Sequence, residues 1–278
     1  MPSEIRAGSR GRSYGASAVV TGAGSGIGRA FARELARRHG RVVCADVDEA
    51  GAKDTVARIE ADGGRGLALG CDVADKRQVW ELSEAAEHWL GHPPTLVVNN
   101  AGIGTGGHVL GETPLSDWHR TLGVNLWGVV HGSHVFVPWL RAAGSGGIIN
   151  VASAASFAAA PRMGAYNVSK AAVLALSETL AAELDGTDVV VSVVCPTFVK
   201  TSIADNELID SAAAELAARL MRITGVSPEF IATRALDAHD RGKLYILPQR
   251  DARLLWRFKR WAPRSYTRLA GLLGRSLP

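Results

Sequence analysis

The sequence has 278 residues, of which 47% are hydrophobic and 21% charged, and its net charge is +4. This length suits one large α/β domain with an additional segment, which needs no metal or disulfide to fold. The composition excludes disordered and low-complexity architectures. No apolar run approaches the roughly 20 residues of a membrane span, and the first residues lack the apolar core of a secretion signal. We therefore expect a cytoplasmic protein whose three cysteines are reduced core residues.

The positive charge is concentrated at the two ends of the chain. Residues 250–278 carry eight Arg or Lys against one Asp, a net charge of +7, and residues 1–14 carry a net charge of +2. The segment between them holds 20 basic and 25 acidic residues, a net charge of −5. A nucleic-acid-binding protein has its basic residues on the folded body, so we expect no nucleic-acid partner. We expect a flexible arm over residues 1–14, one domain over residues 15–248 and a basic helical tail over residues 249–278.

Short apolar segments alternate with helical patterns along the chain. The expected strands cover residues 17–20, 42–46, 67–71, 96–99, 148–152, 189–195 and 244–247. The expected helices cover residues 27–39, 50–61, 76–90, 115–140, 166–184 and 228–240. This alternation predicts an α/β fold with a doubly wound (Rossmann) parallel sheet of seven strands. Its ligand crevice is expected at the carboxyl ends of the strands.

A glycine-rich turn, Thr-Gly-Ala-Gly-Ser-Gly-Ile-Gly, occupies residues 21–28 between the first strand and the first helix. Glycines allow close backbone approach, and a helix N-terminus binds a pyrophosphate group. An ordinary βα turn is the alternative, but Asp46 ends the second strand 20 residues after Gly26, where a carboxylate binds the ribose hydroxyls of a dinucleotide. The residues expected to contact the cofactor here are Gly22, Ser25, Gly26, Ile27, Gly28 and Asp46.

Asp46 also predicts which dinucleotide is bound. Its carboxylate would repel the 2′-phosphate of NADP, and no Arg or Lys occupies the glycine turn or Val47 to compensate. Asp48 adds further negative charge. We therefore expect NAD as the cofactor.

With these motifs in place, the chain resembles the short-chain dehydrogenase/reductase family over roughly residues 15–248. The matching positions after the glycine turn are Asp46, Asp72-Val73, Asn99-Asn100-Ala101-Gly102, Asn125, Ser153, Tyr166, Lys170 and the segment Pro196-Thr197-Phe198-Val199-Lys200-Thr201. The resemblance implies an NAD-preferring oxidoreductase that acts on CH–OH groups through an Asn-Ser-Tyr-Lys tetrad. It also implies a homodimer or homotetramer, built on the helices expected over residues 115–140 and 166–184.

The resemblance assigns further cofactor contacts. Asp72 is implied to bind the adenine and Val73 to border it. Asp72 could also be a turn residue that caps the helix near Lys76, and the two roles are compatible. The implied contacts on the remaining strands are Asn99, Ala101, Gly102, Pro196, Val199 and Thr201. A structural role for Asn99 in the sheet is the alternative. Thr197 stands where the family usually has glycine, and its β-branched side chain leaves the loop shape and the pocket width open.

Tyr166 and Lys170 lie one helical turn apart and share a face of the helix. A phenol with a pKa of about 10 is a poor base at neutral pH, but a neighbouring ammonium and the positive nicotinamide ring lower that pKa. Tyr166 is therefore expected to be the general acid/base, while Lys170 lowers its pKa and holds the ribose.

Ser153 follows an expected strand end and would stabilise the substrate oxygen. Ser156 is nearby, but the family spacing of thirteen residues to Tyr166 favours Ser153. Asn125 is implied to hold a water that relays protons from Lys170, with a buried structural amide as the alternative. No metal is required, because the nicotinamide carries the hydride.

Three segments are expected to wall the substrate site, over residues 103–110, 154–163 and 198–225, the last as a helical lid. The residues expected at the substrate are Ser153, Phe157, Met163, Tyr166 and Phe198. The apolar lid predicts a lipophilic alcohol or ketone, unless its apolar residues serve only to pack the lid onto the domain. For His108, a solvated loop histidine is favoured over a substrate ligand.

The tail has an amphipathic pattern. Its arginines form one stripe at residues 250, 253, 257 and 260, with Leu254, Leu255, Phe258 and Trp261 on the neighbouring face before Pro263. Tyr266 and the leucines at 269, 272 and 273 continue the pattern. The tail is expected either to lie peripherally on a membrane or to pack on a neighbouring subunit.

NAD-dependent alcohol oxidation is thus the leading prediction. A 3-ketoacyl thioester reductase is the second, although its relatives have an arginine where Ser25 stands. A non-catalytic dinucleotide-sensing protein is the third, although such proteins commonly lose the tyrosine or lysine that this chain keeps.

Overall fold

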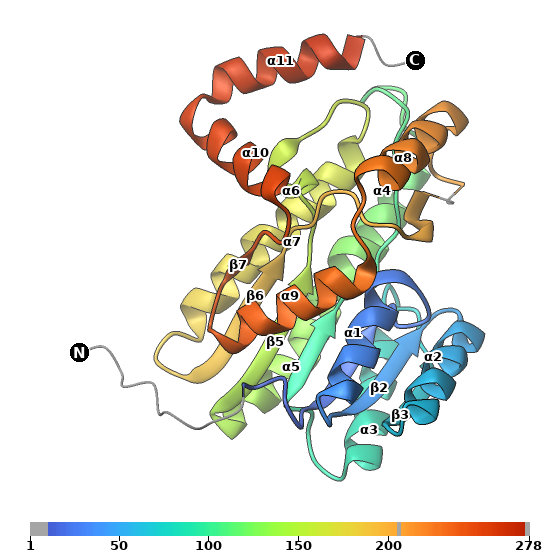
Figure 1. Ribbon diagram of the computed structural model, residues 1–278, viewed down its shortest axis with the longest axis vertical. Coiled ribbons are helices and arrows are strands. Elements are labelled where there is room, and N and C mark those ends of the chain that lie inside the picture. The colour runs from blue at the N-terminus through green and yellow to red at the C-terminus, as the bar shows by residue number, and fades with distance from the viewer. Residues whose placement is uncertain (1–10, 205–206, 276–278) are drawn as a thin grey trace.

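The computed structural model describes residues 11–204 and 207–275. Its centre is a sheet of seven parallel strands in the order β3-β2-β1-β4-β5-β6-β7 (Figure 1). The strands are β1 Ser17–Thr21, β2 Arg41–Asp46, β3 Arg65–Gly70, β4 Leu96–Asn99, β5 Ser145–Val151, β6 Asp188–Val194 and β7 Tyr245–Ile246. The predicted seven-stranded, doubly wound sheet is confirmed.

Helices cover both faces of the sheet. They are α1 Gly26–Arg37, α2 Glu49–Ala61, α3 Lys76–Leu90, α4 Leu115–Leu122, α5 Gly128–Ala143, α6 Ala155–Ala158, α7 Gly164–Glu183, α8 Ser211–Thr224, α9 Pro228–Asp240, α10 Arg250–Trp261 and α11 Pro263–Arg275. One core lies between the sheet and α1, α2 and α9, and others lie under α3, α5 and α7. In Figure 1, α1 and α9 lie side by side on the near face.

The two cores explain why the strands are apolar throughout rather than alternating. In β1, Val20 packs in the core with Phe31 of α1, whereas its neighbour Val19 packs on the opposite face with Phe136 of α5. Successive side chains of a strand point to opposite faces, so a sheet covered on both sides needs apolar residues at every central position.

The helix expected over residues 115–140 is not a single α-helix, which corrects that prediction. A π-helical turn over Gly123–Trp127 joins α4 to α5. A π turn widens the helix by one residue and is common at functional sites. Periodicity alone did not reveal it, because the apolar pattern continues through the turn.

The expected flexible arm covers residues 1–14, of which residues 1–10 lie outside the described residues. Residues 11–14 contact the domain, which differs from that expectation. Ser13 is buried, and its hydroxyl donates to Asp240 at 2.7 Å. The guanidinium of Arg38, also buried, contacts Glu34 at 2.8 Å, Asp237 at 2.6 Å and Asp240 at 3.3 Å. This Arg38 cluster ties the start of the chain and α9 to the end of α1.

His239 of α9 is a second polar residue in the core. The hydroxyl of Ser192 donates to the carbonyl of Lys243 at 2.7 Å, so it accepts from His239 Nδ1 at 2.8 Å. Nε2 then carries no proton, and it points at Gly147, where any side chain would overlap it. Burial lowers the pKa of His239 to about 3.

This histidine predicts a loss of stability in mild acid. Because the folded pKa lies below the ordinary 6.5, only the unfolded chain gains a proton as the pH falls from 6.5 toward 3. The stabilisation that this depressed pKa gives the folded state is fully present only at a pH above 6.5. About 2 kcal/mol of the free energy of unfolding should be lost by pH 5. Urea unfolding at pH 7 and pH 5 measures this loss, and His239→Asn should show a smaller one. Replacing the exposed His119 with Asn is the control and should leave the pH dependence unchanged.

Candidate active site

The carboxyl ends of β1, β2, β4, β5 and β6 meet at one edge of the sheet, and the segments that follow them form the site. The glycine turn follows β1 and leads into α1. Gly22 and Gly26 have positive φ values of 65° and 50°, which only glycine adopts without strain. A Cβ at Gly28 would overlap the carbonyl oxygen of Gly22. The turn therefore requires glycine at these three positions.

The start of α1 fits a phosphate group. Ser25 is its N-cap, but its side chain makes no capping hydrogen bond. The first N–H groups of a helix have no partner within the helix, and they carry the positive end of its dipole. Ile27 packs against the core behind the turn. These features fit the pyrophosphate of a dinucleotide.

Asp46 ends β2 beside this turn. Its Oδ2 accepts from the backbone N–H of Gly24 at 2.7 Å, and its Oδ1 accepts from that of Asp48 at 2.9 Å. These two bonds fix the orientation of the carboxylate, and each oxygen keeps a further lone pair for a ribose hydroxyl. The neighbouring Val47 is exposed and supplies no cation. The residues present thus fit the adenosine of a dinucleotide.

Asp75, rather than Asp72, caps α3, so the capping role expected for Asp72 is wrong. Asp75 accepts from the N–H of Arg77 at 2.8 Å. Asp72 instead accepts from the N–H of Ala74 at 2.9 Å, which closes the turn after β3. Val73 is buried and packs against Gly128 of α5.

Asn99, expected at the cofactor, is buried within the sheet instead. Its side-chain amide donates to Asn150 of β5 at 2.9 Å, and Asn150 donates to Ser177 of α7 at 3.0 Å. The structural alternative describes the contacts of its side chain, and the expected cofactor contact of Asn99 stays a prediction. Ala101 lies beside the glycine turn, since a Cβ at Gly22 would come within 2.8 Å of its Cα.

Asn100 is a site residue that the sequence reasoning did not assign. Its side-chain amide donates to the carbonyls of Thr21 at 2.9 Å and Gly22 at 3.2 Å. It therefore holds the glycine turn against the segment after β4. Its place in the Asn-Asn-Ala-Gly motif was the available signal.

The four expected catalytic residues converge at the ends of β4 and β5. Tyr166 forms a side-chain hydrogen bond with Ser153. Lys170 is buried, its ammonium donates to the carbonyl of Val151 at 3.1 Å, and it lies 5.9 Å from the centre of the Tyr166 ring. Gly102 lies between Lys170 and Asn125, since a Cβ there would be 3.2 Å from both Lys170 Nζ and Asn125 Oδ1.

Asn125 lies in the π turn, where both ends of its amide are engaged. Its Oδ1 accepts from the N–H of Ile103 at 2.8 Å, and its Nδ2 donates to the Ile103 carbonyl at 2.9 Å. The same Nδ2 contacts Ser169 at 3.2 Å, and Ser169 donates to the Tyr166 carbonyl at 2.8 Å. Asn125 thus joins the segment after β4 to α7.

Burial dominates the titration of this group. It raises the pKa of Tyr166 above its ordinary value, against the opposing effect of the hydrogen bond with Ser153. It lowers the pKa of Lys170 to about 8. The lowering of the Tyr166 pKa that we expect from Lys170 together with the nicotinamide ring stays a prediction.

The loop after β6 is held by Gln249, another residue that was not predicted. Its Oε1 accepts from the N–H of Thr197 at 2.9 Å, and its Nε2 donates to the Phe198 carbonyl at 2.9 Å. Pro196 and Val199 are buried, and Thr201 lies against Gly26 of the glycine turn. The loop therefore borders the crevice with Thr197 in place of the usual glycine.

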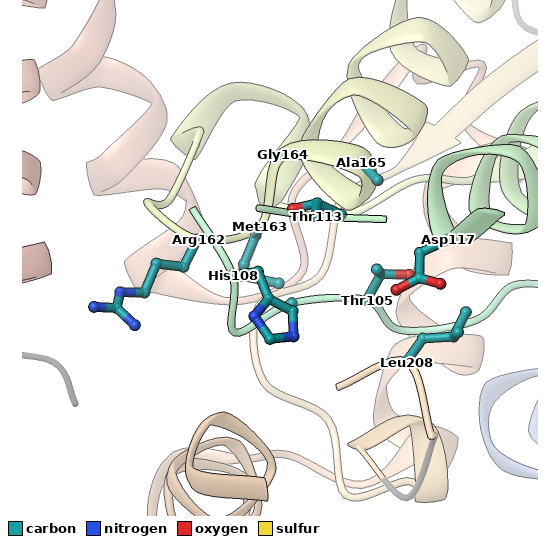
Figure 2. Close-up of a pocket in the computed structure, with 10 residues that line it drawn as sticks. Thr105, His108, Thr113, Asp117, Arg162, Met163, Gly164, Ala165 and Leu208 are labelled. Carbon is teal, nitrogen blue, oxygen red and sulfur yellow. The ribbon is translucent and has the colours of Figure 1, made fainter. Parts of the chain in front are cut away.

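The three expected substrate walls meet beside the start of α7. Gly106 donates to Leu208 at 3.2 Å, and Gly107 donates to Arg162 at 2.9 Å. A small pocket between the walls is bordered by Gly164 and Ala165 at the start of α7 (Figure 2). These two residues precede Tyr166 in the sequence. It is lined by Thr105, Gly106, His108, Thr113, Asp117, Arg162, Met163, Gly164, Ala165 and Leu208.

Met163 is thus the expected substrate residue that lines this pocket. His108 also lines it, and its side chain is exposed, as expected for a solvated loop histidine. Phe157 lies elsewhere, because its ring packs edge-on against Trp256 of α10 with 4.9 Å between ring centres. Phe198 does not line the pocket either. Sequence reasoning missed the contact of Phe157 with Trp256 because α10 comes from a distant part of the chain.

Comparison with known proteins identifies the family. The model of the short-chain dehydrogenase family matches residues 16–210. The chain belongs to the short-chain dehydrogenase family.

Two curated relatives and one solved structure are similar to this short-chain dehydrogenase. The probable oxidoreductase EphD of Mycobacterium tuberculosis is 45% identical over 66% of this chain, which spans only 31% of that relative's length. A 1-deoxy-11-beta-hydroxypentalenate dehydrogenase of Streptomyces exfoliatus is 36% identical over 85% of this chain and 84% of its own. The crystal structure of a short-chain dehydrogenase/reductase from Burkholderia phymatum in complex with NAD is 37% identical, with a TM-score of 0.82 over 88% of this chain and 92% of that one.

Proposed function

We propose that this short-chain dehydrogenase uses NAD to oxidise a lipophilic alcohol, with Asn125, Ser153, Tyr166 and Lys170 as its catalytic tetrad. The observation that carries the proposal is the position of the buried ammonium of Lys170, 5.9 Å from the centre of the Tyr166 ring, with Ser153 in contact with the side chain of this tyrosine. A tyrosine is useful as a base only where its surroundings favour the phenolate, and a buried cation beside it does so.

Each residue of the tetrad has one role in the proposed reaction. Ser153 donates a hydrogen bond to the substrate oxygen, while Tyr166 takes the hydroxyl proton. When bound, NAD would supply the hydride acceptor, and its positive ring would favour the phenolate of Tyr166. Lys170 stabilises the phenolate and holds the ribose. Asn125 positions Lys170 through the segment at Gly102 and belongs to the proton relay.

The cofactor choice is proposed from Asp46. The NAD complex of the Burkholderia phymatum relative supports a dinucleotide in this crevice, and the carboxylate fixed by Gly24 and Asp48 would repel a 2′-phosphate.

Replacing Asp46 with Ser should therefore weaken the preference for NAD. We expect kcat/KM with NAD to fall about tenfold and that with NADP to rise, because the like-charge repulsion is removed. Steady-state kinetics with both cofactors measure the ratio. Asp54→Ser on α2 is a matched control, since this half-exposed carboxylate pairs with Arg58 and Arg29. A wild-type enzyme that prefers NADP by a large factor would contradict the assignment.

The substrate is proposed to be a small hydrophobic alcohol or its ketone. Met163 and Leu208 place apolar side chains beside the start of α7, and Thr105, Thr113 and His108 add polar groups there. The relative named as a hydroxypentalenate dehydrogenase acts, by its name, on a hydroxylated compound. NADH absorbance across a series of steroid, terpenoid, retinoid and fatty alcohols tests the proposal. Oxidation restricted to short polar alcohols would contradict it.

We also propose a homodimer or homotetramer through α4, α5 and α7. Apolar side chains on and between these helices are exposed, among them Leu115, Trp127 and Val168. Light scattering of the full chain measures this state.

A further inference from the structure

The two C-terminal helices have one face against the domain and another that points away from it. In α10 the inward positions are Ala252, which is buried, and Leu255 and Trp256, which pack against the core under β7. Leu255 therefore does not share the outward surface with Leu254, although the sequence pattern had placed both on one face. The spacing of these residues is that of one helix face.

Contacts with the segment between Ser153 and Tyr166 fix the orientation of both helices. Trp256 packs on Phe157, as described above. The hydroxyl of Tyr266 in α11 donates to the carbonyl of Ala158 at 2.6 Å. Gly274 of α11 lies against Pro161. A Cβ atom at Gly274 would come within 2.8 Å of the proline ring.

The outward face combines basic and large apolar side chains. Trp261 is 89% exposed and Leu254 is 67% exposed, and both lie among Arg250 and Arg257 on the same side of α10. On α11 the exposed residues include Leu269, Arg264 and Arg268. Asp251 is the one acidic residue among the described positions 250–275.

We propose that this outward face of α10 and α11 binds the surface of an anionic lipid bilayer. Guanidinium groups attract lipid phosphates, while Trp and Leu side chains enter the boundary between headgroups and acyl chains. A net charge of +7 over residues 250–278 is complementary to such a surface. The two helices are also the outermost elements at one end of the molecule (Figure 1), so a flat surface can reach them.

This mode of binding is peripheral. Among the described residues, no helix combines the length and the apolar character needed to cross a membrane. The apolar side chains on the outward face are separated by arginines, which keep the helices in the headgroup layer. The proposal stands apart from the catalytic assignment, because lipid binding needs none of the tetrad residues.

Flotation of the full chain with lipid vesicles tests the proposal. We expect the protein to float with vesicles of phosphatidylcholine containing about 30% phosphatidylglycerol, to remain unbound with pure phosphatidylcholine, and to dissociate in high salt. Equal binding to both vesicle types, or no binding to either, would overturn the proposal.

Charge-reversal variants identify the face. The double variant Arg257→Glu/Arg268→Glu should bind anionic vesicles at least roughly tenfold more weakly than the wild type. The control Arg65→Glu/Arg241→Glu changes the net charge equally at exposed positions outside the tail and should bind within about twofold of the wild type. Equal loss in both variants would mean that net charge, rather than this face, attracts the protein.

Two further measurements separate the possible failures. NADH fluorescence titration and thermal unfolding should be the same for the wild type and both variants, which excludes misfolding and keeps the result independent of catalysis.

Leu254→Ser/Trp261→Ser should also reduce vesicle binding, since these residues supply the apolar part. If the wild type does not float and the tail variants instead change the mass found by light scattering, the face is a contact with a second copy and the proposal is wrong.

Discussion

Tyr166→Phe is expected to lower turnover about a thousandfold while leaving NADH affinity nearly unchanged. The substitution removes only the phenolic oxygen, which accepts the substrate proton in the proposed reaction. The ring, which lies 5.9 Å from the Lys170 ammonium, is retained. Steady-state kinetics and NADH fluorescence titration measure the two quantities separately.

Tyr245→Phe is the matched control for this experiment. Its hydroxyl donates to Glu178 on the surface at 2.7 Å, so the same atom is removed away from the crevice. Turnover should stay within about twofold of the wild type, since a single exposed hydrogen bond contributes little. If Tyr166→Phe also kept full turnover, the catalytic role of Tyr166 would be wrong.

Arg38→Met is expected to lower the free energy of unfolding by about 3–5 kcal/mol. The variant leaves Glu34 and Asp240, which are almost buried, without the guanidinium that pairs with them. The arginines at positions 37 and 38 hold the pKa of Glu34 below its ordinary value despite burial. Urea unfolding at neutral pH measures the loss.

Arg37→Met is the control for the Arg38 cluster. Arg37 pairs with the same Glu34 at 2.7 Å, but its side chain is 72% exposed. Exposed ion pairs contribute about 0–1 kcal/mol, so this variant should be nearly as stable as the wild type. Similar losses in both variants would contradict the claim that burial gives the Arg38 cluster its importance.

The order of strands and helices could be predicted from local pattern. Apolar segments such as Val19-Val20 and glycine turns report local geometry directly, and the parallel sheet follows from their alternation. The π turn at Asn125 could not be predicted in this way, because its extra residue lies within an apolar pattern that an α-helix also satisfies.

The residues of the candidate site also divide into those that the sequence indicates and those that it does not. Asp46, Tyr166 and Lys170 carry their chemistry in the residue type and spacing, so the sequence indicates them. The roles of Asn100 and Gln249 depend on partners 51 to 79 positions away in the chain. Periodicity holds no information on such pairs. The pKa of Tyr166 also depends on burial by distant segments, which residue type and spacing do not reveal.

Gln249 has a consequence for any shortened form of this protein. Its amide joins Thr197 and Phe198 to the first residue of the C-terminal segment, and Arg253 continues the attachment by donating to the Leu247 carbonyl at 2.9 Å. In a chain ending at residue 248, the N–H of Thr197 and the carbonyl of Phe198 in the loop after β6 would lose their partners in Gln249. Deletion analysis should therefore cut after residue 253, so that a change in turnover is not mistaken for an effect of the removed helices.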